Sequence, residues 1–392
     1  MRHRETLVWG LSAGLFWCVL AVACGEHASG SAAAGAGGDG AGGARAPDDA
    51  AVGGAKAAYT PCVYAGAEEG LRYVELPSVG DAAVGMPWLW VSGDGGTVVM
   101  SVGSAADGYR HVFRWRPGTD FEDLTETTHG ALTRVVATSC DGSVILGSSG
   151  DYGQPARFTD AEGAVPLAAC GAEDAGIVAD CDDACRVVVG TCGYAMSKTV
   201  ASGAAARWDG DNPPVPLYQS QPDGDWTFAS AVSGNGRTIA GEIASGSALH
   251  PFFWTSATGL KPAAPDGASP SMSRDGSTIV ARGRDGMYRL RGGVLTALPC
   301  ASTAPYCEVT SLSADGDVVL VDQGGEMMVW RGDQALEPLG DIVENLGVDL
   351  KQKKIVLARM TPDERVLVGT VNGDTPDAPA NGFYMVLPPH AL

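Results

Sequence analysis

The chain has 392 residues and a formal net charge of −20, with 18 % charged residues, 45 % hydrophobic residues and 55 glycines. This acidic balance argues against nucleic-acid binding, because affinity for nucleic acid comes mainly from Lys and Arg that neutralise phosphates. Abundant glycine with few charges is also unlike a helical protein, so we expect strands and tight turns to dominate. A single closed all-β domain of about 250 residues or more is compatible with this length.

The first 23 residues have the features of an export signal. Two arginines precede an apolar run at 7–23, and Cys24 follows it. Residues 21–24, Ala-Val-Ala-Cys, resemble a bacterial lipobox, which implies that Cys24 is lipidated, and Gly25 then favours an outer-membrane lipoprotein of the cell envelope. Lipoproteins carry at least two lipid chains, enough for a stable membrane anchor. The same Ala-x-Ala pattern also suits ordinary signal peptidase.

Residues 24–58 predict a tether. Of the 34 residues from 25 to 58, 10 are Gly and 13 are Ala, and bulky apolar side chains are almost absent. Such a segment cannot bury enough apolar surface to offset the entropy cost of ordering. We therefore expect a lipidated Cys24 followed by a flexible tether and a folded domain at 59–392.

One pattern recurs seven times from Val91 to the C-terminus. Each copy has an apolar stretch, a turn like Ser-x-Asp-Gly, a β-branched run and then an aromatic strand. The anchor residues are Asp94, Asp141, Ala184 in a degenerate copy, Asn235, Asp275, Asp315 and Asp363. Their spacings of 40 to 51 residues match a four-stranded propeller blade. The sequence therefore predicts an all-β fold, a seven-bladed β-propeller.

Each copy divides into four expected strands, a to d. The turn between strands a and b is tight because Asp and Gly tolerate positive φ. The strands c read HVFRW, QPARF, AAARW, HPFFW, GMYRL, EMMVW and NGFYM, and their third and fifth positions share one face for packing between blades. The last copy lacks a strand d, and an orphan strand at 71–77 precedes the first. We expect this N-terminal strand to close the last blade by pairing with 383–387.

The combination of Ser-x-Asp-Gly, a β-branched run with Gly, and His-x-Phe-x-Trp resembles the bacterial extracellular HAF-repeat family, and more distantly the propeller repeats of TolB-type proteins. The resemblance covers about residues 70–390, and the full aromatic signature is present in HVFRW and HPFFW. It implies export and a noncatalytic scaffold, and it transfers no active-site residue to this chain.

The sequence predicts no catalytic, cofactor or metal residues. The recurring Asp residues each lie in a separate hairpin, whereas Ca²⁺ needs about six to eight oxygen ligands, so turn formation explains them better. Asp209, Asp211 and Asn212 resemble the start of an EF-hand loop without its later Gly and Glu. His111 and His250 occupy the same repeat position and have no zinc-type spacing, which indicates structural roles.

Two functions remain open from the sequence. The leading hypothesis is a noncatalytic lipoprotein scaffold that binds a protein or polysaccharide of the envelope or the extracellular space. The alternative is a carbohydrate-active enzyme of glycosidase, sialidase or lyase type, because SGDGGT resembles a sialidase Asp box. Such an enzyme should have two carboxylates within about 10 Å in a central pocket. A sialidase also needs clustered arginines, and the candidates are Arg134, Arg157, Arg207, Arg282, Arg284 and Arg289.

Long variable segments are expected on one face of the propeller. Those at 191–203, 218–228, 340–354 and 371–381 should all lie opposite the tight a-to-b turns, and binding residues are often found on such loops. Tyr218 and Trp226 are candidate partner contacts there, with simple packing over the loop as the alternative.

Eight cysteines remain besides Cys18 and Cys24, an even number that indicates disulfides in an exported chain. Four of them lie near the tight turns and four near the long loops. A strand of about six residues separates the two faces by roughly 20 Å, too far for a bridge. The expected pairs are Cys300–Cys307, Cys170–Cys192, Cys181–Cys185 and Cys62–Cys140, and free buried thiols are the alternative for some of them.

Overall fold

The computed structural model describes most of the chain after residue 58. The described residues are 59–66, 70–76, 83–104, 110–125, 132–149, 154–171, 176–196, 201–217, 226–245, 248–263, 267–283, 286–300, 304, 306–332, 334–351, 353–372 and 381–392. The chain divides into two units, Met1–Tyr59 and Thr60–Leu392, and every described strand belongs to the second unit. The predicted signal, Cys24 and tether lie outside the described residues, as does Tyr218.

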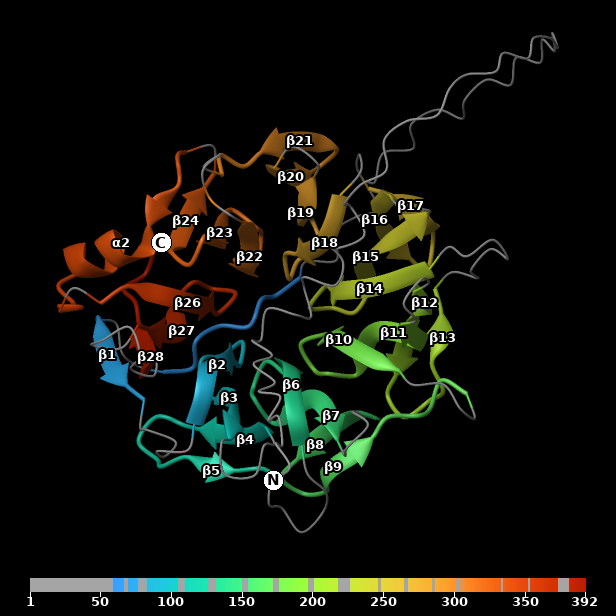
Figure 1. Ribbon diagram of the computed structural model, residues 1–392, viewed down its shortest axis with the longest axis horizontal. Helices are drawn as coiled ribbons and strands as arrows, with labels where there is room; N and C mark the ends of the chain where they lie inside the picture. Colours follow the sequence, from blue (N-terminus) through green and yellow to red (C-terminus); the bar gives the residue numbers. More distant parts are fainter. Residues whose placement is uncertain are drawn as a thin grey trace, which may run out of the picture. The chain divides into compact units, whose positions relative to one another are not determined.

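Seven four-stranded antiparallel sheets build this second unit, and they form the predicted seven-bladed β-propeller (Figure 1). Blades 1 to 3 comprise β2 (Ala83–Val91), β3 (Val98–Ser104), β4 (Arg110–Trp115) and β5 (Glu122–Asp123); β6 (Leu132–Thr138), β7 (Val144–Ser149), β8 (Gln154–Thr159) and β9 (Gly163–Pro166); and β10 (Ile177–Cys181), β11 (Val187–Met196), β12 (Ala201–Asp209) and β13 (Val215–Pro216). The first strand of each blade is innermost (Figure 1).

The next three blades repeat this order. They comprise β14 (Trp226–Val232), β15 (Thr238–Ser245), β16 (Ala248–Thr255) and β17 (Gly259–Pro262); β18 (Gly267–Met272), β19 (Thr278–Gly283), β20 (Gly286–Arg291) and β21 (Val294–Ala297); and β22 (Cys307–Leu312), β23 (Val318–Gln323), β24 (Met327–Arg331) and β25 (Glu337–Pro338).

The seventh blade joins the two ends of the unit. It comprises β26 (Ile355–Met360), β27 (Val366–Val371), β28 (Asn381–Val386) and β1 (Arg72–Glu75). β1 pairs antiparallel with β28, with Arg72 opposite Val386 and Glu75 opposite Phe383. The prediction that the N-terminal strand closes the last blade is therefore confirmed.

The a-to-b turns share one hydrogen-bonding pattern. Ser92 Oγ donates to Asp94 Oδ1 at 2.6 Å, Gly96 N donates to the same oxygen at 2.8 Å, and Thr97 N donates to Ser92 Oγ at 2.9 Å. The corresponding pairs in five other blades are Ser139 and Asp141, Ser233 and Asn235, Ser273 and Asp275, Ser313 and Asp315, and Thr361 and Asp363. The recurring Asp is thus engaged by its own turn.

The degenerate third blade keeps this turn with different residues. Asp182 replaces the serine, and its Oδ1 accepts hydrogen bonds from the backbone N of Arg186 at 2.7 Å and of Val187 at 3.0 Å. Cys185 takes the position of the turn glycine with φ +46°. In this blade the Asp182 carboxylate therefore accepts both backbone hydrogen bonds. In the other blades a hydroxyl accepts one of them and the side chain of the following Asp or Asn accepts the other.

The hydrophobic core consists of seven clusters, one between each pair of neighbouring blades. The third and fifth positions of strand c pack together, as expected: Phe113 and Trp115 lie in the cluster between blades 7 and 1. The Trp115 ring lies 5.1 Å from that of Tyr384 in the preceding blade. Burying a large side chain stabilises a fold by about 1.5–3 kcal/mol, so these columns hold neighbouring blades together.

Arginines at the fourth position of strand c face the following blade. Arg114 lies over the Phe158 ring at 5.7 Å, Arg207 over Trp254 at 5.9 Å, and Arg289 over Trp330 at 4.2 Å. Each is a cation–π contact between adjacent blades. The sequence analysis missed this role, although the Arg before the last residue of HVFRW, AAARW and GMYRL could have revealed it.

Adjacent a-to-b turns are linked by backbone hydrogen bonds at six junctions of the ring. The donors and acceptors are Asp94 N to Cys140 O, Cys140 N to Asp183 O, Asp183 N to Gly234 O, Gly234 N to Arg274 O, Asp275 N to Ala314 O, and Ala314 N to Pro362 O. At the seventh junction Pro362, which occupies the position that donates in blades 2, 3, 4 and 6, has no N–H to donate. Within the described residues a different segment of the chain links blades 7 and 1.

Residues 60–66, which we call the strap, make that closure between blades 7 and 1. Tyr64 N donates to Asp363 Oδ2 at 2.6 Å, and Ala65 N donates to Asp94 O at 3.1 Å. The strap fits only because Gly93 has no side chain, since a Cβ there would lie 2.6 Å from Cys62 Cβ. The strap therefore supplies the missing link of the ring.

The four disulfides join the pairs expected from the blade pattern. They are Cys62–Cys140, Cys170–Cys192, Cys181–Cys185 and Cys300–Cys307, with Cα–Cα distances of 5.8, 5.4, 4.9 and 6.4 Å. Disulfides persist in oxidising compartments, which indicates a location outside the cytoplasm. No helix within the described residues is long and apolar enough to cross a membrane.

Two of the expected loops contain regular structure. Most of 191–203 belongs to β11 and β12, because backbone pairing extends this hairpin through residues whose side chains show no strand-like alternation. The segment 340–354 begins within the helix α2 (Leu339–Asn345), which buries Leu339, Ile342 and Val343 between blades 6 and 7. Their i, i+3, i+4 spacing was the missed signal.

Trp226 is likewise not a loop residue. It is the first residue of β14, it pairs with Ala244, and its side chain is half-buried. The remaining parts of the two other expected loops, 218–225 and 373–380, lie outside the described residues.

Candidate functional site

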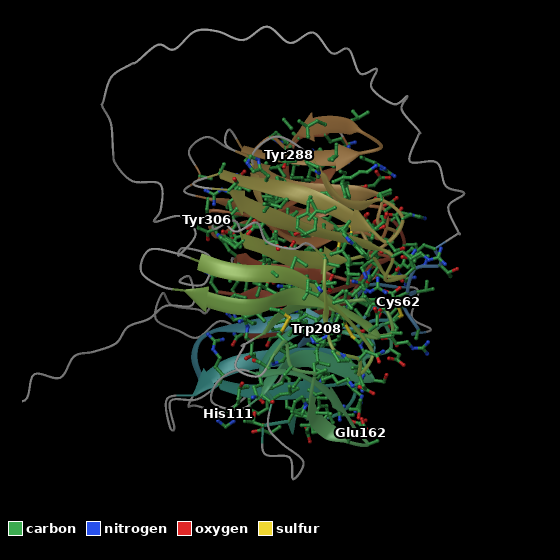
Figure 2. The ribbon with its side chains drawn as sticks, turned by 90° about the vertical axis from the view of Figure 1, so that its right-hand side faces the viewer. Cys62, His111, Glu162, Trp208, Tyr288 and Tyr306 are labelled. Atoms are coloured by element: carbon green, nitrogen blue, oxygen red, sulfur yellow. A yellow bond between two sulfur atoms is a disulfide. The ribbon has the colours of Figure 1, made fainter. Side chains whose placement is uncertain are left out.

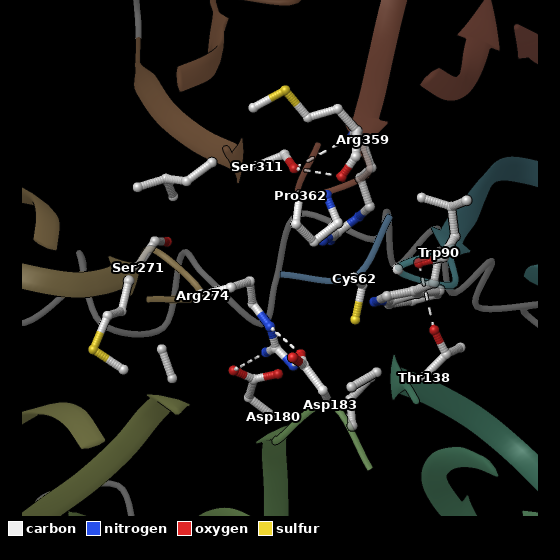
Figure 3. A pocket seen from close by; sticks show the side chains of 18 of the residues that line it. Cys62, Trp90, Thr138, Asp180, Asp183, Ser271, Arg274, Ser311, Arg359 and Pro362 are labelled. Carbon is white, nitrogen blue, oxygen red and sulfur yellow. Dashed lines mark hydrogen bonds and ion pairs between the residues drawn. The ribbon is translucent and has the colours of Figure 1, made fainter. Parts of the chain in front are cut away.

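The innermost strands of all seven blades enclose a cavity of about 260 Å³ (Figure 3). It lies toward the end of the propeller that carries the a-to-b turns, which we call the turn end. One residue of each blade contributes at an equivalent position, two residues before the first residue of the turn. These seven residues, the cavity ring, are Trp90, Ala137, Asp180, Ala231, Ser271, Ser311 and Arg359.

The residues of the cavity ring lie beside irregularities in the pairing of strands a and b. The ladder between strands a and b shifts register in every blade. A bulge bends the strand and re-aims its side chains, and bulges are common near binding sites. In four blades the facing residue on strand b is glycine; a Cβ on Gly190, for example, would lie 1.9 Å from Ile177 O. The backbone of strand a at the bulge leaves no room for a side chain on strand b, which explains why each of these β-branched runs contains a Gly.

Arg274 enters the cavity from the turn of blade 5 and binds two carboxylates of blade 3 (Figure 3). Its Nη2 lies 2.7 Å from Asp183 Oδ1, and its Nη1 lies 3.6 Å from Asp180 Oδ2. Both terminal nitrogens also donate to Cys181 O at 3.0 Å, and Nη1 donates to Val232 O at 3.3 Å. One guanidinium thus ties together blades 3, 4 and 5.

Asp180 is fully engaged by its surroundings. Its Oδ1 accepts a hydrogen bond from Cys181 N at 2.8 Å, and its Oδ2 accepts one from Val232 N at 2.9 Å. Burial raises the pKa of Asp180, and Arg274 opposes this rise. Asp180 and Asp183 meet the distance expected for a pair of glycosidase carboxylates, because both contact one guanidinium. Their hydrogen bonds and ion pairs, however, join blade 3 to blades 4 and 5, which is a structural role.

Arg359 projects into the same cavity from blade 7 (Figure 3). Its guanidinium carbon lies 5.2 Å from the centre of the Trp90 ring. Within the described part of the chain it makes one hydrogen bond, from Nη1 to Thr310 O at 3.4 Å. Burial lowers the pKa of Arg359 to about 10, and Asp180 acts in the opposite direction, so the group remains charged at neutral pH.

A second acidic pair lies at the opposite end of blade 6. Glu308 and Asp322 face each other across β22 and β23. Burial and then Asp322 raise the pKa of Glu308, with Arg282 opposing the rise. Burial also raises the pKa of Asp322, which shares a hydrogen bond with Tyr306. Like charges directly opposite each other destabilise a sheet, so this pair is unusual.

Three of the arginines considered for a sialidase-like cluster have separate partners and do not converge. Arg157 pairs with Asp211, Arg207 pairs with Asp209 at 2.6 Å, and Arg289 stacks on Trp330. These three arginines occupy the same position of strand c in blades 2, 3 and 5, so they are distributed around the ring. Arg284 lies outside the described residues.

The residues that the sequence analysis compared with metal ligands have other partners. Asp209 and Asp211, from the segment that resembles an EF-hand, are bound by Arg207 and Arg157. His111 Nδ1 lies 3.2 Å from Asp123 Oδ2, and its ring stacks with Phe113 at 6.1 Å. No group of three His, Cys, Asp or Glu residues suited to a metal ion occurs among the described residues.

The fold and the cavity define a protein of the β-propeller class. No protein-family model and no curated protein matches the chain. It is similar to an oligogalacturonate lyase solved in complex with manganese, at 15 % identity and a TM-score of 0.51 over 77 % of this chain and 88 % of that one.

Two further solved structures extend this likeness. The oligogalacturonate lyase of Vibrio parahaemolyticus shares 11 % identity at a TM-score of 0.56, over 81 % of this chain and 97 % of the other. A prolyl endopeptidase shares 14 % identity at a TM-score of 0.52, and 82 % of this chain aligns with 47 % of that longer protein. At these identities the comparison shows the propeller fold alone, since one fold hosts many activities.

Proposed function

We propose that this chain is a noncatalytic, exported lipoprotein of the HAF-repeat type, anchored through Cys24, whose propeller binds a protein or polysaccharide of the cell envelope or its surroundings. The four disulfides support an oxidising compartment. The engaged carboxylates of Asp180 and Asp183 favour a scaffold over a catalyst.

The position at which the chain enters the propeller carries this proposal. Cys62 is bonded to Cys140 at the turn end, and the strap continues along the same end. Figure 2 shows Cys62 and Tyr306 at opposite ends of the blades. The turn end is therefore the end at which the chain enters the propeller, and we assign the partner to the opposite end, which we call the loop end.

The loop end also has the more varied structure. It carries α2, the connection before β22 that is bridged by Cys300–Cys307, and the hairpin of β11 and β12 bridged to Cys170. Glu344 is exposed on α2. Variable connections on a rigid scaffold are frequent binding sites, which makes this end the proposed partner surface.

Site-specific photocrosslinking of the full chain in its host tests the partner surface. A crosslinking amino acid at Glu344, on the loop end, should give a discrete covalent adduct. The same amino acid at Arg237, exposed on the turn of blade 4, is the matched control and should give none. An adduct that forms only from position 237 would overturn the assignment.

Labelling with a radioactive fatty acid tests the anchor. The full chain should incorporate the label, and Cys24→Ala should abolish incorporation while export continues. Equal labelling of both proteins would show that Cys24 is not the lipidated residue.

The alternative of a carbohydrate-active enzyme is favoured by one observation, the close pair of Glu308 and Asp322 with Tyr306 at the loop end. If it is correct, the protein should cleave an envelope glycan, and Glu308→Gln and Asp322→Asn should each abolish cleavage. A scaffold predicts no cleavage by the parent protein.

A further inference from the structure

The cavity ring differs in chemistry around its circumference. Blades 2 and 4 contribute Ala137 and Ala231 on either side of Asp180, whereas blades 5, 6, 7 and 1 contribute Ser271, Ser311, Arg359 and Trp90 in succession. A cavity filled only for packing would hold apolar side chains at these equivalent positions. One side of this cavity is instead cationic and hydroxyl-bearing.

The Arg359 guanidinium retains hydrogen-bonding capacity toward the cavity. It has five N–H donors, and its single hydrogen bond within the described residues is long, at 3.4 Å. Its guanidinium carbon lies over the Trp90 ring, 5.2 Å from the ring centre. Because only one N–H group is used in that long hydrogen bond, others remain that match a planar carboxylate in a forked arrangement. Arg274 has no such N–H groups left for a ligand carboxylate, because its nitrogens already contact Asp180, Asp183 and two carbonyls.

The neighbouring wall suits a hydroxylated ligand. The Ser271 hydroxyl makes no hydrogen bond with any other described residue, although Ser271 lines the cavity. Ser311 Oγ is already paired with the backbone of Met360, at 3.2 and 3.3 Å. A cavity of about 260 Å³ is smaller than the roughly 300–1,000 Å³ of drug-sized sites, which limits the ligand to a small molecule.

We propose that this cavity binds a small hydroxylated monocarboxylate, of the aldonate or uronate class, with the carboxylate held by Arg359 and a ligand hydroxyl by Ser271. A single negative charge fits because Asp180 and Asp183 repel more highly charged anions from the same space. The free sugar acid and a terminal sugar acid of a glycan share this chemistry. The site is independent of the partner proposed for the loop end.

Isothermal titration of the exported full chain with sodium glucuronate tests the proposal. The parent protein should bind one equivalent, whereas glucose and acetate should bind at least about tenfold more weakly, because each lacks one part of the recognised chemistry. Arg359→Met should lower glucuronate affinity by about tenfold or more, the usual scale for a lost charge-assisted hydrogen bond. Arg359→Lys should recover part of that loss, since it restores the charge without the fork.

Two controls keep the result independent of folding. Arg237→Met removes an exposed arginine outside the cavity and should leave affinity unchanged. The melting temperature of Arg359→Met should stay within about 4 °C of that of the parent, because Arg359 makes one long hydrogen bond and Arg274 still neutralises the carboxylates of blade 3. A reducing-end-blocked oligosaccharide ending in glucuronate distinguishes the glycan terminus, which should bind, from the free acid alone. Absence of glucuronate binding, equal binding of glucose or acetate, or an unchanged affinity in Arg359→Met would each overturn the proposal.

Discussion

The turn end and the loop end of the propeller are built from the same seven blades but differ in how far they depart from the repeat. At the turn end every blade forms one kind of turn, and neighbouring turns are joined by backbone hydrogen bonds, by the strap and by Arg274. At the loop end the connections include a helix, an extended hairpin and two disulfide-bridged segments. The difference indicates that the turn end is held to one structure by contacts between neighbouring turns, while the loop end accommodates connections of different structure.

Deletion of the segments that close the ring should have the largest effect on stability. A chain lacking residues 59–76 loses the strap, β1 and the Cys62–Cys140 disulfide, and it should show no cooperative unfolding transition, because blade 7 is left with an unpaired edge. A chain lacking only 59–66 keeps β1 and should still unfold cooperatively at a lower temperature. Circular dichroism melting distinguishes the two, and a normal transition in the longer deletion would contradict the closure.

The disulfides at the two ends should differ in their contribution. Cys62 and Cys140 are 78 residues apart, whereas Cys300 and Cys307 are 7 apart. By the loop-entropy relation, replacing the first pair with serine should lower the free energy of unfolding by about 4 kcal/mol, and replacing the second pair by about 2 kcal/mol. Chemical denaturation without reductant measures both. An equal loss from the two pairs would remove this distinction between the ends.

Arg274 should be the most sensitive single residue of the turn end. Arg274→Met leaves Asp180 and Asp183 without their counter-charge, and we expect a loss of about 2–4 kcal/mol, the scale for breaking a largely buried ion pair. Arg237→Met, at the exposed turn of blade 4, is the control and should change stability by no more than about 0.5 kcal/mol. Similar stabilities for the two variants in urea unfolding would show that the Arg274 network contributes nothing.

Substitution of Glu364 should cause the smallest change in the free energy of unfolding, and the change should be an increase. It replaces the turn glycine in blade 7 with φ +63°, a conformation that costs an L-residue about 1–2 kcal/mol. Burial, and then the carboxylates of Asp315, Asp317 and Asp363, raise its pKa to about 7. Glu364→Gly should therefore stabilise the protein by about 1 kcal/mol, through relief of the backbone conformation.

The pH dependence separates the charge of Glu364 from its backbone conformation. Because its pKa is raised from 4.5 in the folded state, ionisation disfavours the fold, and this group lowers stability as the pH rises from about 4.5 to about 7. Glu364→Gln should stabilise the protein at pH 8 but not at pH 4, whereas Glu364→Gly should do so at both. Denaturant titrations at the two pH values check this, and a Gln variant stabilised equally at both would disprove the assigned pKa.

The repeat made much of the turn end predictable. Its alternating strand c residues, such as Phe113 and Trp115, and its turn pairs, such as Ser92 and Asp94, have local causes that sequence spacing reports. The disulfides were predictable too, because blade geometry restricts which cysteines can meet. At these positions the contacts in the structure are the ones that the spacing of the sequence repeat predicts.

The cavity could not be predicted in the same way. Arg359 and Trp90 lie in strands a of blades 7 and 1, 269 positions apart in the chain, and their contact depends on ring closure and on the bulges that re-aim strand a. The strap was also missed as a link, because Tyr64 binds Asp363, which lies 299 positions away in the chain. Helix α2 is too short for its spacing to stand out from a loop.

Binding of the unanchored protein to isolated envelopes tests the central claim, that the loop end is the partner surface, most directly. Full-length Cys24→Ala protein carrying a fluorophore should bind saturably. Reversing two exposed charges near α2, with Glu344→Arg and Asp349→Arg, should weaken that binding by about tenfold, or 1.4 kcal/mol, and Arg237→Glu at the turn end should leave it unchanged. Binding that is lost with Arg237→Glu and retained with the loop-end variant would contradict the account.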